Sequence, residues 1–124
     1  EASGCEELVL LKELALLLSP KVYEANSEQR RYLHLAAVFA CNFTNHMYAL
    51  SASLLEKQGL PFDAMLPLID ETARKVHELP PAQAQTGPAI RRDKNVMDKH
   101  LSMLLEEPSM KEIYEKISKN IQEL

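Results

Sequence analysis

Glycine is scarce in this 124-residue chain, and its three copies, Gly4, Gly59 and Gly87, lie far apart in the sequence. A dinucleotide-binding turn of the Rossmann type needs glycines at Gly-x-Gly-x-x-Gly spacing, because the backbone must approach the pyrophosphate closely. No segment of the chain has that spacing. The sequence therefore predicts no cofactor-binding residues in this chain and excludes a complete Rossmann domain within it.

Cysteine is also rare, with only Cys5 and Cys41, which are too few for a disulfide framework. Cys41 lies within an apolar helical pattern, and this favours a reduced, cytoplasmic setting. The longest apolar run that looks buried, Leu35 to Cys41, is much shorter than the roughly 20 residues that span a bilayer. No signal peptide is recognisable. The chain begins at Glu1 without a methionine, so we expect a part of a longer protein.

Charge and metal-binding residues exclude further classes of partner. The net charge is −4, which gives no electrostatic reason to expect nucleic acid or an anionic membrane surface. The four histidines are dispersed, and neither His-Glu-x-x-His nor Cys-x-x-Cys occurs. We therefore expect no nucleic acid, no membrane and no metal as a ligand.

Helical signals dominate the pattern, since aromatic residues make up only 6% and no alternating strand pattern is present. We predict one all-α domain over residues 1–124. Its helices are expected near residues 5–18, 26–58, 62–78, 88–106 and 108–124, with a single turn at 81–85. Asn26 and Gln29 have capping-box spacing at the start of the second helix, and Gly59 is placed to end it. Pro67 should perturb the first turns of the third helix.

The long second helix is apolar nearly all round in its first half, where Leu33, Leu35 and residues 36–41 leave no polar face. A helix of this kind is normally buried on every side. A chain this short cannot easily enclose it, so we expect another subunit or domain to cover part of it.

A polar cluster interrupts this apolar helix: His34, Asn42, Thr44, Asn45 and His46. At 100° per residue, His34, Cys41 and Asn45 share one stripe. Two interpretations stay open: the cluster hydrogen-bonds to neighbouring helices and fixes their packing, or it lines a cleft and orients a polar substrate. A cysteine hydrolase is excluded because His34 and Cys41 are roughly 10 Å apart along the helix axis.

A second candidate site is the segment Gln85–Asp93, with sequence QTGPAIRRD. Gly87 permits close approach of a ligand, and a helix expected to start at Pro88 would present free N–H groups beside Arg91. Such a site suits a carboxylate or phosphate. The alternative is an ordinary loop before a helix, with Thr86 as its cap and Asp93 paired to an arginine. Spacing alone favours the alternative.

Three motifs together suggest a family. They are Arg31–His46 (RYLHLAAVFACNFTNH), Pro67-Leu-Ile with Glu71-Thr-Ala, and Gln85–Asp93 followed by His100-Leu. The chain resembles the C-terminal helical domain of unknown function that follows a Rossmann domain in bacterial oxidoreductase-like proteins. That group is similar to pyrroline-5-carboxylate reductase, ketopantoate reductase and 6-phosphogluconate dehydrogenase.

The resemblance implies a fold like the C-terminal domain of 6-phosphogluconate dehydrogenase, in which shorter helices pack around a long central one. It also implies a homodimer through helical surfaces, a small-molecule substrate, and NADP or NAD bound mainly by the N-terminal Rossmann domain of the same polypeptide. Residues 1–3 would be the tail of that domain. Two sets of residues would face the interdomain cleft: catalytic His34, Asn42 and Asn45, and substrate-binding Gln85, Thr86, Gly87, Arg91 and Asp93.

One feature departs from the related hydroxyacid dehydrogenases, which carry a catalytic lysine on the long helix, four residues before an asparagine. This chain has no lysine between Lys21 and Lys57. His34 or His46 is then the candidate acid/base group. We expect a dimerisation and substrate-cleft domain of an NAD(P)-dependent oxidoreductase that is inactive alone. The alternative is a non-catalytic helical oligomerisation or interaction module.

Overall fold

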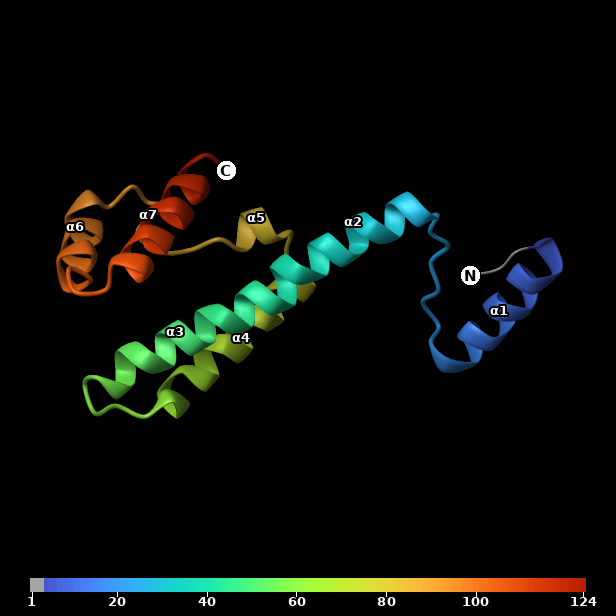
Figure 1. Cartoon of the computed structure of the whole chain (residues 1–124), viewed down its shortest axis with the longest axis horizontal. Coiled ribbons are helices and arrows are strands. Elements are labelled where there is room, and N and C mark those ends of the chain that lie inside the picture. Colours follow the sequence, from blue (N-terminus) through green and yellow to red (C-terminus); the bar gives the residue numbers. More distant parts are fainter. Residues whose placement is uncertain (1–3) are drawn as a thin grey trace. The chain divides into compact units, whose positions relative to one another are not determined.

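The computed structural model describes residues 4–124, and residues 1–3 and the side chain of Cys5 lie outside the described part. The expectation that residues 1–3 end a preceding domain therefore falls outside it. The chain forms two compact units, Glu1–His46 and Met47–Leu124. Within residues 4–124 the ordered elements are helices, without a strand (Figure 1), so the all-α prediction is confirmed.

None of the helices in the described range combines the length and the hydropathy that a membrane crossing requires.

The first unit begins with helix α1, Cys5–Leu18, whose bounds agree with the prediction. Ser19 ends it in an extended conformation, because a residue that precedes a proline is disfavoured in the helical region. The Nζ atom of Lys12 lies 2.6 Å from Oε1 of Glu24, an ion pair that links α1 to the segment after it.

Helix α2, Ser27–Ala37, begins with the predicted capping box. The side chain of Asn26 accepts from the Gln29 N–H, and the Gln29 side chain accepts from the Asn26 N–H, each at 2.8 Å. These two bonds satisfy N–H groups that have no partner within the helix.

The chain then runs through η1, a π-helix over Val38–Phe43, directly into α3, Thr44–Glu56. A π-helix bonds each N–H five residues back, so its turns are wider than α-turns. The Thr44 hydroxyl donates to the carbonyl of Phe39, also five residues back, at 3.3 Å. The predicted stripe from His34 through Cys41 to Asn45 assumed 100° per residue and is wrong across this segment.

The C-terminal end of α3 is closed by Gly59, as predicted, in a left-handed conformation with φ of 67°. Its N–H donates to Glu56 O at 3.0 Å, and the N–H of Leu60 donates to Leu55 O at 3.0 Å. These nested bonds form a Schellman motif, in which a glycine avoids the steric penalty of the left-handed region.

The region expected as a third helix contains two elements. A 3₁₀-helix, η2, covers Phe62–Met65, and α4 covers Leu66–Glu78 with Pro67 in its first turn. Pro67 thus perturbs the start, as predicted, because it has no N–H to continue the ladder from η2. The short α5, Pro81–Ala84, is the expected single turn.

The predicted fourth helix over residues 88–106 is wrong in its bounds. Helix α6 covers only Lys94–Met103. Residues 88–92 form a turn, which ends where Arg92 takes a left-handed φ of 53°. The N–H groups of Arg92 and Asp93 donate to the carbonyls of Ala89 and Pro88 at 3.0 and 2.9 Å. Asp93 then caps α6, since its Oδ1 accepts from the Val96 N–H at 3.2 Å.

The last helix, α7, Pro108–Gln122, starts at the predicted proline. Two contacts link it to α6: the amide nitrogen of the Gln122 side chain lies 3.7 Å from Sδ of Met97, and His100 contacts Tyr114. An ion pair between Lys57 and Glu107 links the end of α3 to the start of α7.

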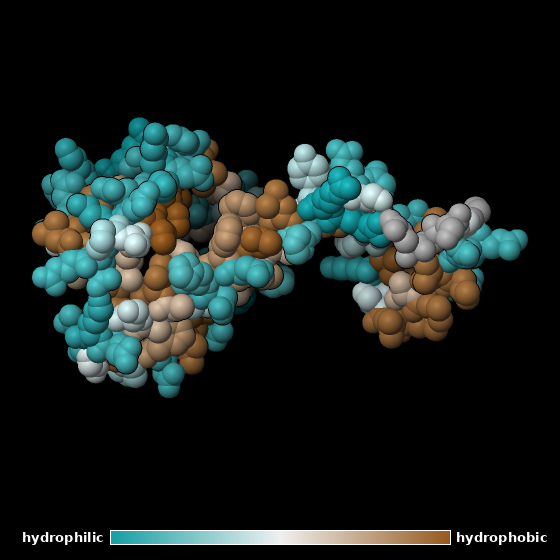
Figure 2. All heavy atoms as spheres, viewed as in Figure 1, coloured by the Kyte–Doolittle hydropathy of each residue, from teal (hydrophilic) through white to brown (hydrophobic). Residues whose placement is uncertain are grey.

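The buried core of the described residues is small and lies in the second unit, where Ala89, Leu104 and Ser118 are each 6% exposed. In the first unit, apolar side chains stay on the surface, and Figure 2 shows them gathered over α1. Leu17 and Leu18 are 82% and 90% exposed. The short chain thus leaves much of its apolar side-chain surface uncovered.

Candidate functional site

A pocket of about 360 Å³ lies within the second unit. Helix α3 contributes the side chains of one wall: Met47, Leu50, Ser51 and Leu54. Helix α7 contributes another: Met110, Ile113, Tyr114, Ile117, Ser118 and Ile121. Thr86, Pro88, Ala89 and Leu104 complete the lining. The pocket is in the size range of small-molecule sites, and most of its lining is apolar, as is common for such sites.

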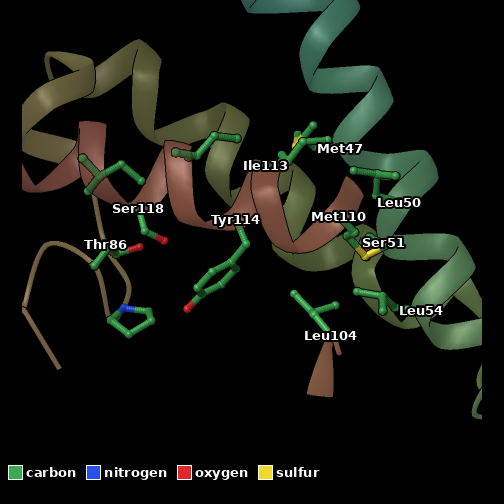
Figure 3. Close-up of a pocket in the computed structure, with 14 residues that line it drawn as sticks. Met47, Leu50, Ser51, Leu54, Thr86, Leu104, Met110, Ile113, Tyr114 and Ser118 are labelled. Atoms are coloured by element: carbon green, nitrogen blue, oxygen red, sulfur yellow. The ribbon is translucent and has the colours of Figure 1, made fainter. Parts of the chain in front are cut away.

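The polar groups of this pocket are not evenly distributed. Figure 3 shows the hydroxyl groups of Thr86, Ser118 and Tyr114 toward one end, whereas Leu50 and Leu54 lie toward the other, with Ser51 between them. The Thr86 side chain belongs to the loop before the turn at residues 88–92, and the other two hydroxyls belong to α7. The hydroxyl-rich end of the pocket is therefore built from the loop that holds Thr86 and from one face of α7.

Tyr114 is held from outside the pocket by His100 on α6. The Nδ1 atom of His100 lies 3.0 Å from the Tyr114 hydroxyl oxygen, and both side chains are half-buried. Their rings meet edge to face, with centroids 5.7 Å apart. A phenolic hydroxyl can donate one hydrogen bond and accept others, so the bond to His100 leaves it capacity for a further partner.

The predicted substrate-binding segment lies beside this pocket, but its residues differ in their surroundings. Thr86 lines the pocket, whereas Gln85 donates to the Thr86 carbonyl at 2.9 Å. Gly87 has φ of 109°, which only glycine adopts without strain. Arg91 is exposed and is not in a helical first turn, since α6 begins at Lys94. The predicted anion site at a helix starting at Pro88 therefore has no such helix to support it.

Asp93, the last of these predicted substrate ligands, uses one carboxylate oxygen to cap α6. This use favours the alternative in which Asp93 has a structural role. The partner of this oxygen is a backbone N–H, however, and not the arginine that was expected. The predicted cap at Thr86 is wrong, because the helix begins at Lys94 and Asp93 is its cap.

The three residues predicted as catalytic lie on the continuous helical run of α2, η1 and α3 in the first unit. His34 belongs to α2, Asn42 to the π-helix and Asn45 to α3, and all three are exposed. π-helical turns are frequent at functional sites. Nearby, the rings of Phe39 and Phe43 meet edge to face at 5.0 Å, although these side chains are 62% and 50% exposed.

Sequence reasoning missed the pair of His100 and Tyr114. Met110, Ile113, Ile117 and Ile121 form an apolar stripe at helical spacing in the sequence, and these side chains lie together in the pocket. Tyr114 and Ser118 are four residues apart and adjoin that stripe, which is a signal that one helix face carries both apolar and hydroxyl groups.

Charged side chains are not gathered around the pocket. The ion pairs on helices α4 and α7 lie on exposed side chains, where they perturb carboxyl groups locally. A hydrogen bond from Lys116 and its positive charge lower the pKa of Glu112, and Arg74 acts in the same way on Glu71. Among the described residues no cluster of three histidine, cysteine or acidic side chains is arranged to hold a metal ion.

The residues of this chain do not fit a dinucleotide. Gly59 is used to end α3, and Gly87 lies in a loop without neighbouring glycines, so neither forms part of a phosphate-binding turn. The side chains that line the pocket provide no positive charge for a pyrophosphate. A nicotinamide cofactor of a larger protein would need other residues to hold its phosphates.

Comparison with known proteins gives a family and one informative structure. Residues 1–121 match the model described as "Domain of unknown function (DUF2520)". A crystal structure from Bacteroides fragilis, described as a "putative NADP oxidoreductase", is 64% identical to this chain, with a TM-score of 0.92. The match covers 100% of this chain and 48% of that protein, so the chain spans about half its length. No curated protein matches. The chain belongs to the DUF2520 family of domains.

Proposed function

We propose that this chain is the substrate-cleft and dimerisation domain of a two-domain NADP-dependent oxidoreductase and is inactive by itself. The observation that carries the proposal is the 64% identity to a protein described as a "putative NADP oxidoreductase", across the whole of this chain but only 48% of the other. The remaining half of such a protein is where a cofactor-binding domain would lie. This chain has no turn suited to that task.

The exposed apolar residues of the first unit support the dimerisation part of the proposal. Leu33, Leu35 and Phe39 are 60%, 51% and 62% exposed, and the leucines of α1 are similarly uncovered. Exposed large apolar side chains in this number favour an interaction site, because their contact with water is unfavourable. A second copy of the chain is the proposed partner for the helical run of α2 and η1.

The substrate-cleft part of the proposal concerns polar side chains that are exposed in the described chain. Asn42 and Asn45 would orient a polar small molecule, and His34 would act as its acid or base. Thr86 and Arg91, which the resemblance implies as substrate-binding residues, stay part of the proposal. No lysine is available on the long helix for proton transfer.

The test uses the complete parent protein, assayed for oxidation of NADPH and NADH with a panel of small carbonyl compounds and acids. We expect activity with NADPH, at least a tenfold decrease for Asn45→Ala or Arg91→Ala, and little change for the control Asn120→Ala, an exposed asparagine on α7. Normal turnover and stability in both site variants would overturn the assignment of these residues. Absence of NADPH binding to the complete protein would overturn the oxidoreductase itself.

The dimerisation part is tested separately by light scattering. We expect a mass near twice that of one chain, and a shift toward the monomer in Phe39→Ser. Leu105→Ser is the matched control, because Leu105 is 69% exposed but lies outside the helical run. A mass near 14.0 kDa for this chain at high concentration would contradict a dimer.

A non-catalytic interaction module is the second candidate, and it is favoured by the same exposed apolar helices. The two candidates differ in the complete protein. A dimer that neither binds nor oxidises NADPH would favour the interaction module.

A further inference from the structure

The pocket between α3 and α7, here called the α3–α7 pocket, differs from the cleft residues of the proposed function in both position and chemistry. Every residue that lines it belongs to Met47–Leu124. Of the residues predicted from the sequence as site residues, only Thr86 lines it. It therefore requires an explanation of its own, which does not depend on NADP chemistry.

Its size and shape are those of a binding site for a small molecule. A volume of about 360 Å³ lies within the usual range for such pockets, roughly 300–1,000 Å³. Leucine and methionine side chains at one end can cover an apolar body, and Figure 3 shows this end beside Leu104 and Met110. An apolar ligand there would be driven in by removal of its surface from water.

The charge of the lining restricts the ligand further. The lining residues comprise aliphatic, methionine, proline, serine, threonine and tyrosine side chains, without a lysine, arginine, histidine or carboxylate. A carboxylate or phosphate inside this pocket would lose its hydration without gaining a cation, which is strongly unfavourable. An uncharged ligand avoids that penalty.

The hydroxyl end supplies a specific contact for an uncharged polar group. Ser118 is only 6% exposed, so its side chain lies within the packed part of this unit. His100 fixes the Tyr114 hydroxyl by the 3.0 Å contact described above, and that hydroxyl retains capacity for one more partner. An alcohol suits either tautomer of His100, because its own hydroxyl both donates and accepts.

We propose that the α3–α7 pocket binds an uncharged amphipathic small molecule, an alcohol or carbonyl compound, with its polar group on the Tyr114 hydroxyl and its apolar chain toward Leu50, Leu54 and Leu104. The pocket is then a recognition site for the apolar part of a ligand, Tyr114 supplies the polar contact, and a lining without charged side chains favours a neutral ligand.

The experiment titrates the protein with octan-1-ol and, separately, with octanoate, and follows the methyl resonances of Ile113 and Ile117 by NMR. We expect saturable shifts with octan-1-ol at these methyl groups and at least tenfold weaker binding of octanoate, because the pocket has no cation. Equal binding of the two probes, or no saturable shift with octan-1-ol, would overturn the proposal.

Two variants and one control make the test specific. Tyr114→Phe keeps the ring and removes the hydroxyl, so octan-1-ol should bind about five- to tenfold more weakly, as expected for one lost hydrogen bond. Ile117→Trp fills the pocket and should abolish the shifts at Ile113. Tyr32→Phe is the matched control, since Tyr32 is 67% exposed on α2 and lies outside the pocket.

The test also separates a small molecule from a polypeptide occupant. If the pocket resonances shift with protein concentration alone and octan-1-ol leaves them unchanged, a second copy fills the pocket and the proposal is wrong. An unaltered affinity in Tyr114→Phe would likewise contradict the assigned contact.

Discussion

Substitution of Gly59 offers a stability change whose size follows almost entirely from backbone geometry. Gly59 has φ of 67°, and a Cβ atom built there has no heavy atom within 4 Å. Gly59→Ala therefore adds no clash with the surroundings. Its cost is the left-handed conformation itself, about 1–2 kcal/mol for a residue with a side chain. Both bonds of the Schellman motif can persist, because they are made by backbone atoms.

Urea unfolding monitored by circular dichroism measures this cost. We expect Gly59→Ala to lower the free energy of unfolding by about 1 kcal/mol with an unchanged m value, and Gly59→Asn to lower it by less, because asparagine tolerates the left-handed region better than alanine. Unfolding curves for Gly59→Ala that coincide with those of the unchanged protein would refute the argument. A larger loss in Gly59→Asn than in Gly59→Ala would do the same.

Three further predictions follow from single contacts. Asp93→Ala should lower the free energy of unfolding by about 1 kcal/mol, because the Val96 N–H loses its cap, and Asp93→Asn should retain most of it; equal stability of both variants would contradict the cap. The Arg74 hydrogen bond and charge hold the pKa of Glu71 below its usual range in the folded chain, so this contribution to stability is present at neutral pH and is lost as the pH falls through that lowered pKa. NMR titration should show a higher Glu71 midpoint in Arg74→Ala, and an unchanged midpoint would disprove the pairing. The thiol of Cys41 is exposed in the single chain, and a dimer through this helix would cover it. Its reaction with a thiol reagent should therefore be fast in dilute protein and slower as the protein concentration rises. A rate that does not depend on protein concentration would argue against such a dimer.

The sequence predicted those elements whose signals are local. Asn26 and Gln29 marked a helix start because their reciprocal bonds involve residues only three apart, and Gly59 marked an end because left-handed geometry favours glycine. Pro20 and Pro67 acted through steric exclusion and a missing N–H, which are also properties of the residue itself. Such features need no information about distant parts of the chain.

The start of α6 could not be predicted in the same way. Residues 88–92 have a helical pattern with proline first, and the turn is terminated by Arg92, a residue that enters the left-handed region only when its surroundings favour it. One such contact is long-range: the Arg92 guanidinium donates to the carbonyl of Gln122 at 3.2 Å. Residues 30 positions apart in the sequence are not connected by any local pattern.

The candidate pocket was predicted only in part, for a similar reason. The periodicity of α7 indicated which side chains share a face, but not that α3, Thr86 and Leu104 lie opposite them. The contact between His100 and Tyr114 joins two helices, and a dispersed histidine gives no sign of its partner. The resemblance implied Thr86 as a substrate-binding residue, whereas the other residues that line the pocket followed only from the fold.

The π-helix at Val38–Phe43 sets the direction in which the side chains after it leave the helix axis. If all six residues were kept and the segment closed into a regular α-helix, every side chain from Thr44 onward would turn by roughly 100° about the helix axis relative to those before Val38, because a π-turn holds about one residue more than an α-turn. Asn45 would then point to a different side of the helix, although its neighbours in sequence were unchanged. In a family member, a regular α-helix of the same length at this position would therefore mean a rotated set of polar groups, and identical motif letters would not imply an identical site.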